Sequence, residues 1–229
     1  MAEFFLDTGQ SLFARLSPPR PPPIVAAMLR RFALFLAALL LPAAATAQAT
    51  TNVVISTARG DIVVALETER APITAANFLR YADEKRFDGI EFYRAMRLDW
   101  GEQPNGLIQA GTQMDPARIL PAIAHEPTSA TGMKLVTGAI SMARYEPGSA
   151  TGDFSITVSP QPGLDADPRA EDPELRAGYA AFGHVVKGMD VVRAIFDAPI
   201  DPAKGEGIMQ GQMLAEPVKV VSVRRVPAN

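Results

Sequence analysis

Short β-rich runs, separated by turn-forming residues, dominate this chain and leave room for only two helices. The first two runs, 52–56 and 61–66, flank Ala58-Arg59-Gly60 and predict a hairpin. Clusters of Gly, Pro and Asp separate the remaining runs from one another. These further strands are predicted over 90–95, 107–112, 136–143, 154–159, 180–187 and 217–226.

Two stretches carry the helical period. After Pro72, apolar residues recur at i, i+3, i+4 and i+7, which predicts an amphipathic helix. A shorter helix is predicted after Gly188, with Met189, Val192 and Phe196 buried. Because closing a sheet removes its exposed edges, the pattern predicts a mainly β fold, a closed eight-stranded antiparallel β-barrel capped by two α-helices.

The N-terminal segment is expected to lie outside this barrel. A basic start, the apolar run 32–41 and a small-x-small cleavage site near Ala49 predict a secretory signal peptide over 28–49. The apolar run is about half the roughly 20 residues that span a bilayer, so no permanent membrane span is predicted. Residues 1–27 are interpreted as a non-native or disordered leader. The mature domain, 50–229, is expected to be periplasmic or secreted.

The composition excludes several kinds of site. The chain has no cysteine, so it has no disulfide, thiolate metal site or cysteine nucleophile. A net charge of -3 gives no basic surface for nucleic acid. His125 and His184 lack carboxylates at ligand spacing, and the segment around Ser149 has alanine where a hydrolase elbow needs serine. We therefore expect no metal and no cofactor.

One arginine stands in an unusual place for a strand. In the run 89–96, simple alternation puts Ile90, Phe92 and Arg94 on one face, with Arg94 near its end. A guanidinium there either turns outward to solvent or lines a concavity. The spacing alone leaves both possibilities open.

Six sequence blocks follow one another in an order that resembles the cyclophilin family of peptidyl-prolyl isomerases. Together they cover about residues 52–226, and the family's barrel with two capping helices agrees with the fold predicted above. The blocks are 71–79 (APITAANFL), 87–94 (FDGIEFYR), 107–111 (LIQAG), 138–144 (GAISMAR), 149–156 (SATGDFSI) and 182–192 (FGHVVKGMDVV).

The resemblance implies catalysis of cis/trans rotation about X-Pro bonds, with Arg94 and Gln109 as catalytic residues. Arg94 would donate a hydrogen bond to the prolyl nitrogen, and Gln109 would hold the substrate backbone. The implied partners are proline-containing peptides or unfolded exported proteins, and the protein is expected to be a monomer. The implied substrate-binding positions are Leu107, Met142, Ala143, Arg144, Asp153, Ser155, Leu164 and Tyr179.

Several positions depart from the family pattern. Gly106, Ser155 and Gly163 stand where the family places aromatic walls of the proline pocket. Burying each of these rings would contribute about 1.5–3 kcal/mol of favourable free energy. Asp153 puts a carboxylate where the family has glutamine. That carboxylate either pairs with Arg94, which would lower activity, or faces solvent and leaves the guanidinium free.

The loops 97–105 and 161–177 are longer than the family's connections. Trp100, in the first loop, is either a replacement wall or an exposed loop aromatic. The sequence thus supports two functions. One is a peptidyl-prolyl cis-trans isomerase that assists folding of exported proteins, and the other is a weak or inactive cyclophilin-like peptide-binding chaperone or assembly factor.

Overall fold

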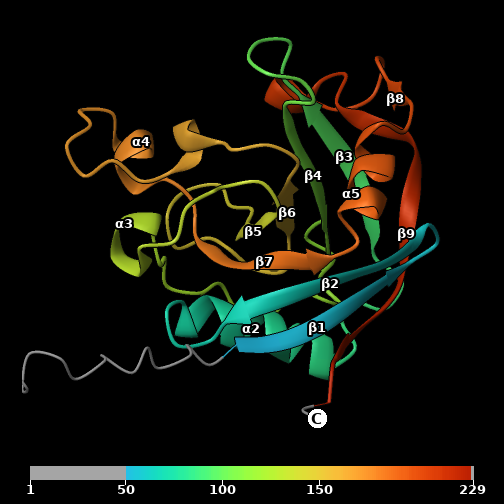
Figure 1. Cartoon of the computed structure of the whole chain (residues 1–229), viewed down its shortest axis with the longest axis horizontal. Coiled ribbons are helices and arrows are strands. Elements are labelled where there is room, and N and C mark those ends of the chain that lie inside the picture. The colour runs from blue at the N-terminus through green and yellow to red at the C-terminus, as the bar shows by residue number, and fades with distance from the viewer. Residues whose placement is uncertain (1–49, 228–229) are drawn as a thin grey trace, which may run out of the picture. The chain divides into compact units, whose positions relative to one another are not determined.

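The part of the chain described by the computed structural model, residues 50–227, forms one curved sheet with helices around it (Figure 1). The helices in this range are α2 (Pro72–Asp83), α3 (Thr128–Thr131), α4 (Pro173–Ala177) and α5 (Met189–Phe196). The strands are β1 (Thr50–Thr57), β2 (Gly60–Glu67), β3 (Glu91–Arg97), β4 (Gly106–Gly111), β5 (Ala139–Met142), β6 (Phe154–Thr157), β7 (Ala181–Lys187), β8 (Ile200–Asp201) and β9 (Met213–Arg225).

The sheet closes on itself as a barrel. Its strand order is β1-β2-β7-β5-β6-β4-β3-β9-β8, and a further pairing of β1 with β9 joins the ends. The pairs are antiparallel, and the short β8 lies outside the closed ring, bonded only to β9. The prediction of a closed eight-stranded antiparallel barrel is confirmed. The last strand begins at Met213 rather than at residue 217, and β5 is shorter than predicted.

Strand alternation fills the barrel with apolar side chains. Phe154, Ile156 and Val158 point inward from β6 and its continuation, with 0%, 0% and 3% of their surface exposed. Aromatic rings from α2 and four neighbouring segments form the centre of this core, with ring centroids 4.9–6.0 Å apart. These rings belong to Phe78, Tyr81, Phe87, Phe92, Phe154 and Phe182.

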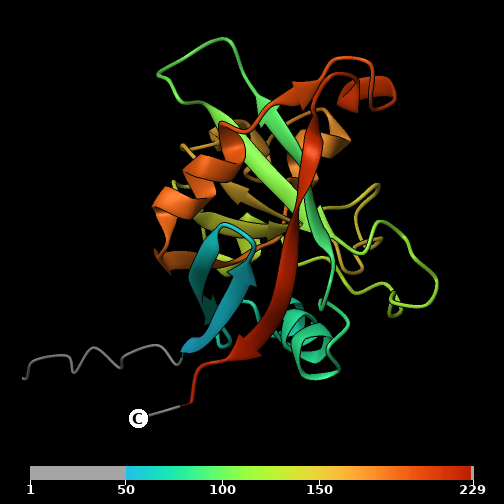
Figure 2. The same ribbon diagram turned by 90° about the vertical axis from the view of Figure 1, so that its right-hand side faces the viewer.

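The two longer helices, α2 and α5, lie on opposite sides of the barrel (Figure 2). Pro72 occupies the first turn of α2, where its missing N–H breaks no helical bond. Val192, Ile195 and Phe196 are the buried face of α5. The apolar faces of both helices join the barrel core, and both predicted helices are confirmed.

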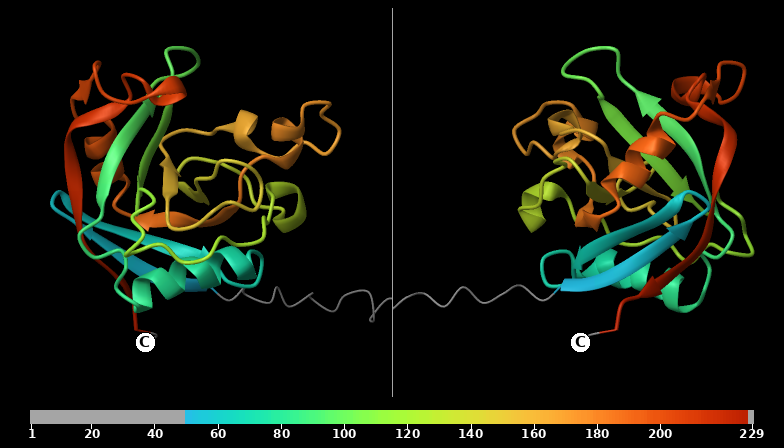
Figure 3. Two further views of the ribbon diagram at one scale, coloured as in Figure 1. Left: turned by 180° about the vertical axis from the view of Figure 1, so that it is seen from behind. Right: turned by 45° about the vertical axis from the view of Figure 1, so that its right-hand side comes forward.

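The connections between β4 and β7 form a layer of loops that includes α3 and α4. Figure 3 shows α3 and α4 side by side, away from the β1–β2 hairpin. A hydrogen bond from the backbone N of Ala166 to Thr128 Oγ1 (2.7 Å) links their two segments.

The predicted leader and signal peptide, residues 1–49, lie outside the described residues. Within residues 50–227, no helix is both long enough and apolar enough to cross a membrane.

Candidate active site

A β-bulge at Tyr93 determines which way the arginine of β3 points. Phe92 pairs with Ala110 of β4 and Arg94 with the next residue, Gln109, so Tyr93 has no partner of its own. Phe92 faces the core, whereas Tyr93 and Arg94 both turn outward and bond to Gln109. The prediction that Arg94 shares a face with Ile90 and Phe92 is therefore wrong, because the extra residue interrupts the alternation.

Two amide side chains hold the guanidinium of Arg94. Arg94 Nη1 donates to Gln109 Oε1 (2.8 Å). Its Nε and Nη2 both donate to Gln212 Oε1, at 2.9 and 2.6 Å, and Gln212 Nε2 donates to the carbonyl of Ile208 (2.8 Å). A guanidinium has five N–H donors, so these bonds leave one on Nη1 and one on Nη2 unused within residues 50–227.

The Asp153 carboxylate neither pairs with Arg94 nor faces solvent alone, as the two expectations had it. Oδ2 accepts from the Tyr93 hydroxyl at 2.9 Å. Oδ1 accepts from Thr112 Oγ1 (3.2 Å) and from the backbone N of Gln113 (2.9 Å). Among the described residues, no carboxylate lies within 4.0 Å of the Arg94 guanidinium. Neutral groups thus surround the cation, and its charge is retained.

Burial shapes the electrostatics of this cluster. Partial burial lowers the pKa of Arg94, while the nearby Tyr93 and Tyr179 oppose that shift. Burial, followed by the charge of Asp153 and the hydrogen bond to it, raises the pKa of Tyr93. Arginine remains protonated in proteins, so the site presents a permanent cation beside a hydroxyl that keeps its proton.

Several predicted substrate-binding residues lie around this outer face. Leu107 and Ser155 are 6% and 7% exposed, and Ser155 lies between Gln109 and Ser141 of the adjacent strands. Both faces of β6 are covered, because all four residues of Phe154–Thr157 are buried. Leu164 and Tyr179 are partly buried and pack against the core from the loop layer.

Met142 and Ala143 differ in position. Met142 is 1% exposed, pairs with Phe154 in the sheet and belongs to the barrel core. The prediction that its side chain lines the cleft is corrected, because Ser141 is the outward residue of β5. Ala143 is half-buried just beyond β5, where its backbone N donates to the carbonyl of Asp153 (2.9 Å).

The structure explains why Gly106 carries no aromatic side chain, but it gives no such reason for Gly163. Gly106 adopts φ +143°, and a Cβ there would stand 1.9 Å from the carbonyl oxygen of Met96, so no side chain fits this backbone. Gly163 has open space around the position of a Cβ. Trp100 is 64% exposed, so it is an exposed loop aromatic.

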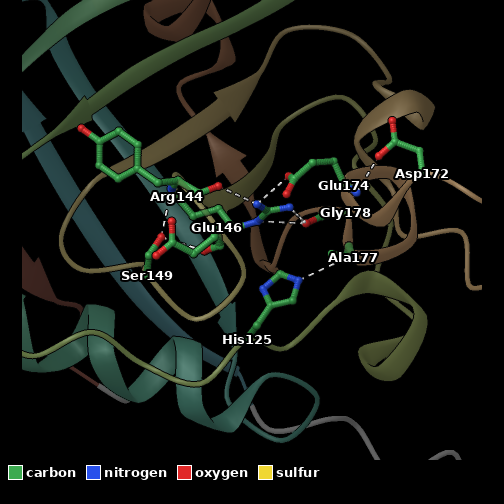
Figure 4. A network of polar contacts seen from close by, with 9 residues as sticks. His125, Arg144, Glu146, Ser149, Asp172, Glu174, Ala177 and Gly178 are labelled. Atoms are coloured by element: carbon green, nitrogen blue, oxygen red, sulfur yellow. Dashed lines mark hydrogen bonds and ion pairs between the residues drawn. The ribbon is translucent and has the colours of Figure 1, made fainter.

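Arg144, predicted to bind substrate, instead holds the loop before β7 (Figure 4). Its side chain is 1% exposed. Nε and Nη2 donate to the carbonyl of Gly178 at 3.2 and 2.8 Å, and Nη1 donates to the carbonyl of Tyr145 and to Glu174 Oε2, both at 2.8 Å. The guanidinium also stacks over Tyr179, 4.8 Å from the ring centroid. Arg144 thereby positions Tyr179 at the edge of the outer face.

Sequence reasoning missed two residues of this site. Gln212 lies 118 residues from Arg94 in the chain, just before β9, and nothing in its local sequence marks it. Tyr93 was hidden because alternation assigns it to the opposite face from Arg94. The only sequence signal for its role is that an aromatic residue with a hydroxyl precedes Arg94, while the neighbouring strand carries the polar Gln109.

The described residues offer no metal centre. Within 50–227, no group of three or more His, Asp or Glu side chains is placed to hold an ion. His125 Nε2 instead contacts the carbonyl of Ala177 at 3.0 Å, as Figure 4 shows.

The family model described as cyclophilin type peptidyl-prolyl cis-trans isomerase/CLD matches residues 52–225. The chain belongs to this family. A peptidyl-prolyl cis-trans isomerase of Acinetobacter baylyi is 35% identical over 182 residues, covering 78% of this chain and 87% of that protein. Peptidyl-prolyl cis-trans isomerase A of Dickeya dadantii is 33% identical over 153 residues, covering 65% and 73%. Membership classes the chain as a peptidyl-prolyl cis-trans isomerase.

Solved structures agree on the fold. The crystal structure of a Cryptosporidium parvum cyclophilin type peptidyl-prolyl cis-trans isomerase superposes with a TM-score of 0.60 at 18% identity, covering 79% of this chain and 100% of that chain. A second structure of that protein, in the presence of the dipeptide Ala-Pro, also gives 0.60 and covers 78% and 99%. At this identity the likeness establishes the shared barrel.

Replacing Arg144 by leucine should loosen the loop before β7. The change leaves the carbonyl of the buried Gly178 without its two donors, at a cost of about 1–3 kcal/mol. The carbonyl of Tyr145 contributes little, because this residue is 72% exposed and water can replace the lost donor. The exposed partner Glu174 contributes little to this loss. We expect faster hydrogen exchange and proteolysis in residues 163–178. The matched control, Arg169→Ala in the same loop, removes a side chain that is 92% exposed and should leave both rates near wild type. Unchanged exchange in Arg144→Leu would contradict this role.

Replacing Gln212 by alanine should lower kcat by about tenfold with little change in KM, because two of the N–H groups that fix the guanidinium plane lose their acceptor. Stopped-flow prolyl-isomerisation assays measure both constants. Gln210→Ala, in the same loop but bonded to the carbonyl of Pro202, is the control and should behave as wild type. A rise in kcat in Gln212→Ala would mean that Gln212 blocks the arginine rather than orients it.

Proposed function

We propose that this protein is an exported peptidyl-prolyl cis-trans isomerase that accelerates folding of proteins outside the cytoplasm. Arg94 is the catalytic donor and Gln109 the residue that holds the substrate backbone. The observation that carries the proposal is a guanidinium held by two neutral amides, with two N–H groups unused in the described structure.

The reaction needs little from the enzyme beyond a well-placed donor. Rotation about an X-Pro amide crosses a barrier of roughly 18–20 kcal/mol because it breaks the N–C conjugation. As the bond twists, the prolyl nitrogen becomes pyramidal and able to accept a hydrogen bond. A donor that bonds this nitrogen only in the twisted form stabilises the transition state selectively. No nucleophile, metal or cofactor is required.

The groups around Arg94 suit this chemistry. The unused Nη1 and Nη2 hydrogens supply the donor, and Gln109 and Gln212 fix its plane before substrate arrives. Because arginine cannot accept a hydrogen bond, it favours the lone pair of the twisted nitrogen. Leu107, Leu164 and Tyr179 supply the apolar surface against which a proline ring would pack. The Ala-Pro dipeptide used with the Cryptosporidium parvum relative supports prolyl peptides as the ligand class.

The proposed location follows from the sequence before residue 50. The basic start, the apolar run 32–41 and the small residues ending at Ala49 have the order of a secretory signal. Clients would then be unfolded exported polypeptides, whose X-Pro bonds isomerise in tens to hundreds of seconds without help.

A second candidate is a peptide-binding chaperone or assembly factor with weak catalysis. Gly106, Ser155 and Gly163 favour it, because they leave the proline ring fewer apolar walls than the family pattern provides. In that case peptides would bind through the outer face, and the rate of isomerisation would not depend on Arg94.

Arg94→Ala should reduce kcat/KM by about 100-fold, the usual effect of losing a transition-state donor. Arg94→Lys should be nearly as impaired, because lysine keeps the charge but not the planar fork. The measurement is the cis/trans exchange rate of an Ala-Pro-containing peptide. Arg97→Ala, which removes the other arginine of β3, is the control and should stay within a few fold of wild type. Equal rates in Arg94→Ala and wild type would favour the binding protein.

Export predicts a defined mature terminus. When a protein starting at Met28 is expressed in a Gram-negative host, we expect the periplasmic fraction to hold a form beginning at or near Thr50, as determined by intact-mass spectrometry. A variant with Phe35→Arg and Leu39→Arg, which breaks the apolar run, should remain uncleaved in the cytoplasm. Uncleaved wild-type protein in the cytoplasm would contradict the proposed location.

A further inference from the structure

Four hydrogen-bonded side chains form a continuous line from a carboxylate to the arginine. Asp153 Oδ2 accepts from the Tyr93 hydroxyl (2.9 Å), and Gln109 Nε2 donates to the same hydroxyl oxygen (2.6 Å). Gln109 Oε1 then accepts from Arg94 Nη1 (2.8 Å). Neighbouring strands bring these groups together, because Arg94 pairs with Gln109 across β3 and β4.

The chemistry of the groups gives this line one direction. The backbone N–H of Gln113 can only donate, and it meets Asp153 Oδ1 at 2.9 Å. An ionised carboxylate only accepts, so the single proton of the Tyr93 hydroxyl is directed to Oδ2. The Tyr93 oxygen is then left as an acceptor for the Gln109 NH2 group. As a result, the carbonyl oxygen of Gln109 must face Arg94.

The surroundings protect the line from water and bring the carboxylate close. Tyr93 and Gln109 are 7% and 8% exposed. A Cβ at Gly111 would lie 2.1 Å from Asp153 Oδ1, so only glycine permits the carboxylate to lie against the end of β4. Burial and the carboxylate raise the pKa of Tyr93, which keeps its proton in place.

We propose that Tyr93 and Asp153 are positioning residues of the isomerase, which fix the Gln109 amide so that its carbonyl oxygen, and not its NH2 group, faces Arg94. This inference rests on the proposed function, in which Arg94 is the catalytic donor. It assigns a role to the carboxylate that stands where the family pattern has glutamine. Asp153 acts through Tyr93 and Gln109 rather than by touching the substrate.

The line predicts an unusual effect of one isosteric change. In Asp153→Asn, the backbone N–H of Gln113 still needs an acceptor, so the amide oxygen of the new side chain takes the place of Oδ1. The NH2 group of that side chain then faces the Tyr93 oxygen. The hydroxyl proton of Tyr93 then turns toward Gln109. Gln109 can satisfy it only by reversing its amide, which directs the NH2 group of Gln109 at the N–H groups of Arg94. Two donors then face each other, and the guanidinium loses its orientation.

The test is a double-variant cycle in the prolyl-isomerisation assay. Asp153→Asn should lower kcat by about tenfold with a smaller change in KM, the effect of one mismatched buried hydrogen bond. Tyr93→Phe removes the hydroxyl that links Asp153 to Gln109, so the Gln109 amide has no reason to reverse. Alone, this variant loses one hydrogen bond to Gln109 and should lower kcat by only about threefold. The double variant should match Tyr93→Phe and exceed Asp153→Asn in kcat. Tyr81→Phe, another buried tyrosine, is the control and should retain wild-type kcat.

Each outcome of the cycle has one meaning. Partial rescue of Asp153→Asn by Tyr93→Phe supports the directed line, because structural damage alone would make the double variant worse than either single variant. Additive losses, or wild-type kcat in Asp153→Asn, would overturn the proposal.

Neutron diffraction of the deuterated protein gives a readout that does not depend on activity. The Gln109 amide deuterons should point at Tyr93 in wild type and at Arg94 in Asp153→Asn. A wild-type Tyr93 deuteron pointing at Gln109 would overturn the proposal. If the deuterons lie as expected but Arg94→Ala is fully active, the proposed function fails while the directed line stands.

Discussion

The bulge in β3 is the constraint on which the site depends. One residue without a partner turns both Tyr93 and Arg94 to the outer face while Phe92 and Ala95 keep their places in the core. A regular strand would send Tyr93 and Arg94 to opposite faces. The bulge therefore brings a cation and a hydroxyl together beside Gln109 without opening the core of the barrel.

The site that results depends mainly on how its hydrogen-bonding groups are oriented. Its cation is held by neutral amides, and the Asp153 carboxylate accepts a hydrogen bond from Tyr93 rather than from the arginine. This arrangement suits a reaction in which no covalent bond forms and the enzyme must only favour a twisted amide. It also explains how Asp153 can replace a neutral side chain without cancelling the charge of Arg94.

Much of the fold could be predicted from the sequence because periodicity and turn residues are local signals. The β1–β2 hairpin, α2 and the inward pattern of Phe154 and Ile156 all follow from such signals. The outward direction of Arg94 could not, since a bulge depends on the register of two partner strands. The same limit hid Gln212, which approaches from a loop that only the closed barrel brings near. The sequence assigned Arg144 to substrate binding by its place in a family block. Its burial under the loop before β7 depends on tertiary packing, which the sequence does not reveal.

The most direct test of the account is a crystal structure of the protein with an Ala-Pro-containing peptide. We expect the proline ring to lie against Leu107 and Tyr179, with an N–H of Arg94 Nη1 or Nη2 directed at the prolyl nitrogen and the bonds to Gln109 and Gln212 intact. A peptide seated elsewhere on the barrel, or one that leaves the Arg94 guanidinium without contact to the prolyl group, would contradict the account.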